Sequence, residues 1–208
     1  MNKIITVARQ FGSGGRELGR RLAEELGCDY YDKEIITQIA EHTSLSEEYV
    51  QQVVEHTPHS LFPITIGQSL SFVSDYQFQL AQSVYHAQSD IIRSLAEKSD
   101  CVIVGRCADY ILREQKPLRI FVYADMDSRV KRCMERNSDA DMTEKEMRKQ
   151  IQQLDKNRAR YYDYYTGLRW GEKENYDLCI NTANADIKKM SKLLAAASEE
   201  RYSISFSL

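Results

Sequence analysis

A glycine-rich turn near the start of the chain carries the strongest chemical signal in the sequence. Residues 4–20 read IITVARQFGSGGRELGR, so an apolar, β-branched run enters the turn and a helix-like pattern leaves it. Glycine accepts positive φ and lets the backbone approach a ligand, so successive amide N–H groups and the following helix N-terminus can point at one anion. We therefore predict a phosphate-binding loop. Its residues are Gly12, Ser13, Gly14, Gly15, Arg16 and Glu17.

This loop departs from the usual phosphate-binding sequence, which reads glycine, four residues, glycine, lysine, then serine or threonine. Arg9 takes the place of the first glycine, and Gly15 follows Gly14 where the lysine is expected. We expect Arg16 to be the cation that meets phosphate. The alternative is a tight turn from strand to helix that binds no ligand.

Charged residues also follow two other predicted strands. Asp32 follows a short strand at 28–31, and Gly105 with Arg106 follows the apolar run CVIV. Ligands of open parallel sheets bind outside the carboxyl ends of the strands, so we expect these residues to converge on the glycine loop. Arg106 would grip a phosphate, and Asp32 would orient the attacking oxygen or hold Mg²⁺ through water. A surface ion pair for Arg106 and a helix N-cap for Asp32 remain open.

Arginines recur at helical spacing between residues 129 and 160. Two helices separated by the turn-like stretch NSDADMTEKE, with a helix start at Thr143, predict a hairpin that closes over the site as a lid. Arginines arriving on such a lid would neutralise phosphoryl charge. The residues expected to do so are Arg132, Arg158 and Arg160. A solvated face of ion pairs with nearby glutamates is the alternative.

Strands and helices alternate along the chain, which predicts an α/β fold. Continuous apolar runs are typical of parallel strands buried on both faces. We predict strands near 3–9, 28–31, 101–106, 118–124 and 177–181, and helices near 16–26, 34–42, 46–56, 74–98, 126–137, 143–165 and 184–198, with residues 57–67 irregular. We expect a single domain over 1–208. Its core comprises 1–32, 99–128 and 166–208, with a helical insertion at about 33–98 and the lid at about 129–165.

The composition limits the partners and the compartment. The chain has 208 residues and a net charge of −3, which argues against binding a nucleic-acid polymer through the whole surface. Five scattered cysteines, an odd number, favour free thiols and a cytoplasmic location. No apolar stretch approaches membrane-spanning length, so we expect no membrane partner.

Five segments together resemble the cytidylate kinase-like proteins of the P-loop kinases. They read ITVARQFGSGGRELGRRLAEELG, YYDKEII, VIVGRCADYIL, RVKRCMER and DKNRARYYDYYTGLRWGEKENYDLCIN, and the resemblance covers nearly the whole chain. It implies a three-layer P-loop kinase fold with a parallel five-stranded sheet. The glycine loop would bind ATP phosphates, the helical insertion would bind the acceptor, and the lid arginines would close over the transferring phosphoryl group.

The resemblance also implies roles for individual residues. Gly105 and Arg106 match the Gly-Arg-Asp segment that engages the acceptor in cytidylate kinases; Cys107 replaces its aspartate, and Asp109 lies two residues onward. The arginines at 132 and 158 match those before and within the lid. The lysine of authentic cytidylate kinases falls at position 15 and the hydroxyl that meets magnesium falls near position 17, and both are replaced in this chain.

The expected activity is Mg²⁺-dependent transfer of the ATP γ-phosphoryl group to a nucleoside monophosphate, with CMP as the first candidate. The alternatives are a non-catalytic nucleotide sensor and a kinase for another small metabolite. The tyrosine-rich segment at 161–170 would stack on a ligand, form a contact within a homo-oligomer or anchor its helix in the core, with Gly167 ending that helix. Anchoring is the preferred interpretation.

Overall fold

The computed structural model describes residues 2–55, 71–136 and 142–204. Within them the strands form one parallel sheet in the order β2-β3-β1-β4-β5, which confirms the predicted five-stranded parallel sheet. The strands are β1 (Ile4–Arg9), β2 (Asp29–Tyr31), β3 (Cys101–Val104), β4 (Leu118–Tyr123) and β5 (Leu178–Asn181).

The helices lie close to the predicted ranges. They are α1 (Gly15–Leu26), α2 (Glu34–Thr43), α3 (Glu47–Glu55), α4 (Ser71–Lys98), α5 (Ala108–Ile111), α6 (Met126–Arg136), α7 (Glu144–Thr166) and α8 (Ile187–Ile204). The short helix α5 was not anticipated, and α8 runs further than predicted. The predicted irregular stretch at 57–67 and most of the turn inside the predicted lid lie outside the described residues.

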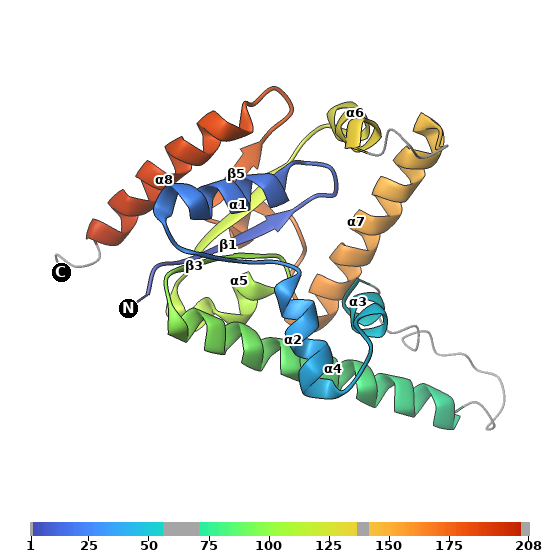
Figure 1. Ribbon diagram of the computed structural model, residues 1–208. Helices are drawn as coiled ribbons and strands as arrows, with labels where there is room; N and C mark the ends of the chain where they lie inside the picture. Colours follow the sequence, from blue (N-terminus) through green and yellow to red (C-terminus); the bar gives the residue numbers. More distant parts are fainter. Residues whose placement is uncertain (1, 56–70, 137–141, 205–208) are drawn as a thin grey trace.

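Helices cover both faces of the sheet, which gives three layers (Figure 1). On one face α1 and α8 pack side by side, and Leu18, Leu22 and Leu194 join strand residues in one buried cluster. On the other face α2, α3, α4, α5 and α7 share a second buried cluster. Because β1 and β3 contribute to both clusters, their runs are apolar at consecutive positions, as expected for central parallel strands.

The turn after β3 is unusual in its backbone. Gly105, Arg106 and Cys107 have φ values of 75°, 60° and 54°. Glycine adopts this left-handed region freely, whereas each non-glycine residue there costs about 1–2 kcal/mol. The fold therefore holds Arg106 and Cys107 in a strained conformation at the carboxyl end of a central strand, a place where strain commonly accompanies function.

Helix α7 is fixed at both ends by local hydrogen bonds. Thr143 accepts from the Glu146 backbone N–H while the Glu146 carboxylate accepts from the Thr143 backbone N–H, which makes a reciprocal capping box. Gly167 ends the helix with φ of 70°. Tyr161 and Tyr162, each 4% exposed, pack into the core, which agrees with the preferred anchoring interpretation.

All five cysteines are free thiols, as predicted. Across the described ranges, every helix is too short or too polar to cross a membrane.

Candidate active site

The glycine loop lies between the carboxyl end of β1 and the N-terminus of α1. Gln10, the residue that follows β1, is hydrogen-bonded to the end of β4 and the residue after it. The Gln10 backbone N–H donates to the Val122 carbonyl (3.0 Å), and the Gln10 side-chain oxygen accepts from the Ala124 N–H (3.2 Å). The buried Ser13 hydroxyl donates to the Gln10 carbonyl (2.9 Å). The Gly15 N–H donates to the Ser13 hydroxyl oxygen (3.4 Å), and the N–H groups that follow it in the first turn of α1 lack carbonyl acceptors within the helix and can bind an anion. The Ser13 hydroxyl therefore shapes the turn that leads into α1.

The side chain of Arg9 fills the space between this loop and the turn after β3. An added Cβ on Gly15 would lie 2.5 Å from Arg9 Cβ and 3.1 Å from Val122 Cβ. An added Cβ on Gly105 would lie 1.7 Å from Arg9 Nη1. Sequence reasoning noted Arg9 only as a replaced glycine. Its place in the site depends on glycines at 15 and 105, which are far apart in the sequence and meet only in the fold.

Asp32 lies at the carboxyl end of β2, where it was predicted, and it pairs with two arginines. Its side chain is 4% exposed; Oδ2 lies 2.5 Å from Arg16 Nε and Oδ1 lies 3.6 Å from Arg9 Nη2. The helix-cap alternative is not what the structure shows, because α2 is capped at Lys33 without a side-chain hydrogen bond. Among the described residues, Oδ1 has no hydrogen-bond partner. Asp32 is therefore a buried carboxylate with acceptor capacity left over.

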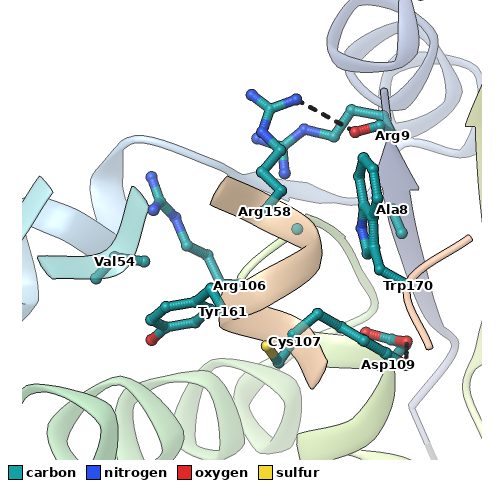
Figure 2. Close-up of a pocket in the computed structure, with 11 residues that line it drawn as sticks. Ala8, Arg9, Val54, Arg106, Cys107, Asp109, Arg158, Tyr161 and Trp170 are labelled. Atoms are coloured by element: carbon teal, nitrogen blue, oxygen red, sulfur yellow. Dashed lines mark hydrogen bonds between the residues drawn. The ribbon is translucent and has the colours of Figure 1, made fainter. Parts of the chain in front are cut away.

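Three arginines line one narrow pocket beside the loop (Figure 2). Arg9 comes from β1, Arg106 from the strained turn and Arg158 from α7, and the pocket has a volume of about 50 Å³. This volume suits a few water molecules or a group of similar size. Arg158 Nη1 donates to the Arg9 carbonyl (3.2 Å), and its guanidinium lies 5.5 Å from the centre of the Phe11 ring. The fold therefore brings Arg106 and Arg158 together at one pocket with Arg9, the last residue of β1.

The electrostatics of this pocket favour an anion. The pKa of Arg9 is lowered to about 9, first by burial and then by the positive charge of Arg158, with further contributions from Arg106 and Arg16 that Asp32 opposes. A phosphate in the pocket would place negative charge beside Arg9, Arg106 and Arg158, and guanidinium groups can bind phosphate bidentately.

Three other predicted site residues, Arg132, Glu17 and Arg160, do not line the arginine pocket. Arg132 donates to the Ser13 carbonyl (3.3 Å) and to the Thr182 carbonyl, so it braces the loop against the end of β5. Glu17 pairs with Arg21 and with Arg136. Arg160 is exposed and lines neither this pocket nor the larger cavity described below.

Asp109 lines the arginine pocket, but its carboxylate is hydrogen-bonded to a buried tyrosine of the core. It accepts from the Tyr162 hydroxyl (2.7 Å) and its residue is 6% exposed. Burial raises the pKa of Asp109, and the Tyr162 hydrogen bond opposes that rise. The buried pair therefore fixes α5 against α7 behind Arg106.

A second, more open cavity of about 380 Å³ is lined by both members of the Arg16–Asp32 ion pair. Its lining is mixed in charge, with the cations Arg16, Arg20, Lys33 and Arg136 and the carboxylates Glu17, Asp32 and Glu34. Its size admits a group larger than a phosphate. The narrow pocket and this wider cavity are linked by one ion pair, because Arg9 lines the first and its partner Asp32 lines the second.

The site offers few ligands for a metal ion. The described residues contain no group of three or more His, Cys, Asp or Glu side chains arranged to hold one. Magnesium commonly binds through one or two carboxylates together with substrate phosphates and water. The open acceptor of Asp32 Oδ1 fits that mode, so Asp32 is the residue that would contribute to holding the ion.

Comparison with solved structures shows which fold the chain has. The fold matches a shikimate kinase from Acinetobacter baumannii in complex with shikimate, with a TM-score of 0.53 and 14% identity over 97% of this chain and 95% of that one. It also matches an uncharacterized protein from Eubacterium ventriosum, with a TM-score of 0.68 and 26% identity over 95% of this chain and 99% of that one. The chain has the three-layer fold of the P-loop kinases.

Sequence comparison narrows the class to a family. Residues 4–184 match the cytidylate kinase-like family, and the chain belongs to it. A relative from Haloarcula marismortui named cytidylate kinase is 26% identical over 184 residues, which are 88% of this chain and 82% of that protein. Family and fold together support a kinase-type, nucleotide-binding phosphotransferase.

Proposed function

We propose that this protein transfers the γ-phosphoryl group of ATP to a nucleoside monophosphate in a Mg²⁺-dependent reaction, with CMP as the first acceptor to test. The observation that carries the proposal is the meeting of Arg9, Arg106 and Arg158 beside a glycine loop at the carboxyl edge of a parallel sheet. Phosphoryl transfer needs mainly positioning and charge neutralisation, and this arrangement offers both. The relative named cytidylate kinase supports the choice of acceptor.

In this proposal the loop amides and Arg16 hold the donor phosphates, while Arg106 holds the acceptor phosphate. Asp32 orients the attacking phosphate oxygen or accepts from water bound to magnesium, and the ion, when bound, neutralises charge on the donor phosphates. Arg158 already lies at the pocket and would contact the transferring group.

Closure belongs to the same proposal. The lid at about 129–165 would bring Arg132 and Arg160 nearer the phosphates, and the insertion at about 33–98 would select the acceptor. Arg132 would have to leave the Ser13 and Thr182 carbonyls to do so. We also propose that the protein acts in the cytoplasm.

The direct test is ADP formation from Mg²⁺-ATP by the purified protein with CMP, dCMP, UMP, AMP or GMP. An Arg16→Ala variant prepared in the same way controls for contaminating kinases. Turnover that depends on one acceptor and is lost in the variant would establish the activity and name the base.

Arg106→Ala should raise the acceptor KM and lower kcat. Removing a charge-assisted contact worth about 1.5–3 kcal/mol corresponds to a loss of roughly 10- to 100-fold in kcat/KM. Arg113→Ala is the matched control, because Arg113 is half exposed and its guanidinium lies over the Tyr110 ring. Unchanged kinetics in Arg106→Ala would remove Arg106 from the site.

A second candidate is a nucleotide-binding module that performs no efficient transfer. The observation favouring it is that Gly15 stands where the usual loop has its lysine and that Arg9 leaves no room for a side chain there. Calorimetric binding of ATP without turnover on any of the five acceptors would favour this candidate or an untested acceptor.

A further inference from the structure

The geometry points to Arg9 as the phosphate-binding cation that replaces the loop lysine, so that arginine at position 9 and glycine at position 15 form one compensating exchange. This inference rests on the proposed function for the identity of the ligand, a nucleoside triphosphate. It concerns a residue that the loop pattern alone leaves out, since the pattern expects glycine at position 9.

Arg9 blocks any side chain at position 15. The atoms that block position 15 are Arg9 Cβ at 2.5 Å and Arg9 Cγ at 3.1 Å from the added Cβ, with Val122 Cβ at 3.1 Å. These atoms lie at the base of their side chains and cannot rotate away as the end of a flexible chain can. Arginine at 9 and lysine at 15 are therefore mutually exclusive in this backbone, and a chain with Arg9 needs Gly15.

The Arg9 side chain runs past position 15 toward the turn after β3. In a standard loop the lysine starts at the N-terminus of the helix and reaches the β- and γ-phosphates. The Arg9 stem passes the spot where that lysine side chain would begin, and its guanidinium continues to the space beside Gly105. Its Nη1 lies 1.7 Å from an added Cβ there, so any other residue at 105 would displace the guanidinium from this position. Arg9 thus delivers a cation from the strand to the region that the lysine would serve from the helix.

The charges around Arg9 favour an anionic ligand. Arg9 is 13% exposed and lines the pocket that Arg106 and Arg158 also line. The one carboxylate recorded within ion-pair distance of Arg9 in the described chain is Asp32, at 3.6 Å, and Asp32 lies closer to Arg16. Mutual repulsion among these partly buried guanidinium groups is relieved when a phosphate enters, because it can bond to several of them at once.

The test compares substitutions at both positions by calorimetry with Mg²⁺-ATP and, as a ligand without a base, inorganic tripolyphosphate. Arg9→Met keeps an apolar stem beside Gly15 and removes the charge, and it should weaken both ligands about 10- to 100-fold. Arg9→Lys should keep affinity within about tenfold, because it retains a cation without the planar fork. Arg113→Ala controls for the loss of one positive charge from the whole chain and should bind as the wild type does.

The exchange itself is tested by Gly15→Lys alone and in combination with Arg9→Gly. Gly15→Lys alone should lower the melting temperature, because its Cβ collides with Arg9. The double variant should recover both the melting temperature and ATP affinity relative to Gly15→Lys, since Arg9 Cβ and Cγ are gone and a lysine stands in the usual place.

The outcomes separate this inference from the proposed function. Weakened binding in Arg9→Met and recovery in the double variant support the inference even when no acceptor is phosphorylated, in which case only the kinase proposal fails. Binding by Arg9→Met equal to that of the wild type, or a double variant no better than Gly15→Lys, overturns the inference even when the wild type turns over. A wild type that binds neither ligand overturns both.

Discussion

At the scale of single residues, the buried carboxyl of Asp109 is the group whose environment most clearly links stability to pH. Burial raises its pKa above the usual value, and the hydrogen bond from Tyr162 only partly offsets this. Below the unfolded pKa, near 4, the carboxyl is protonated in both states and its burial carries no charge penalty. As pH rises through the folded pKa, the native state must ionise a buried group and loses stability relative to the unfolded state.

Asp109→Asn should remove this pH dependence, because the amide oxygen still accepts from Tyr162 and never ionises. The melting temperature of the wild type relative to the variant should therefore fall between pH 4 and pH 7, as measured by thermal unfolding. The melting temperature of a Tyr162→Phe variant should fall more steeply over this pH range than that of the wild type, because the substitution removes the donor that favours the ionised carboxyl. A difference between wild type and Asp109→Asn that stays constant with pH would contradict this account.

Residue-level chemistry was only partly accessible from the sequence. Arg106 and Asp32 could be placed because each directly follows a strand, and parallel strands bring their carboxyl ends to one edge. Arg9 was missed as a site residue because its role depends on the space left by Gly15 and Gly105, which is a property of the packed fold. The hydrogen bonds of Arg132 to the Ser13 and Thr182 carbonyls could not be predicted either, since helical spacing fixes only the face that an arginine occupies.

At the scale of elements, hydrophobic periodicity and helix-capping residues predict most of the helices and strands. The start of α7 was found from Thr143, and the structure shows the full capping box with Glu146. Helix α5 was missed because four residues are too few to show a helical period. The end of α8 was placed too early, since its last residues carry no glycine or proline to stop the helix.

The capping box makes a direct prediction for α7. Thr143→Ala should destabilise the protein by about 1 kcal/mol, because it removes the side-chain acceptor at the helix N-terminus. For a chain of this length that loss lowers the melting temperature by about 2–4 °C. Thr143→Ser keeps the hydroxyl and should remain close to the wild type. Equal melting temperatures for the alanine and serine variants would show that the box contributes nothing measurable.

At the scale of the whole molecule, the predicted lid is tied to the glycine loop by a buried ion pair. Asp155 in α7 pairs with Arg129 in α6, whose side chain is 7% exposed. The Phe11 backbone N–H donates to Asp155 (2.7 Å), and Arg129 donates to the Phe11 carbonyl (3.3 Å). Loop, α6 and α7 are therefore bonded together at one point, so a lid movement that included the middle of α7 would have to break contacts to the loop.

This buried pair should contribute far more to stability than a surface pair between the same two helices. Asp155→Ala leaves the Arg129 charge buried without its partner, which costs about 3–5 kcal/mol and lowers the melting temperature by roughly 6–20 °C. Arg148→Ala breaks the pair with Asp127, which also joins α7 to α6 but has both side chains exposed, and should cost at most about 1 kcal/mol. Thermal unfolding of the two variants side by side measures the difference. Similar losses in both would mean that solvent reaches Asp155, and the bond between lid and loop would then be too weak to restrain closure.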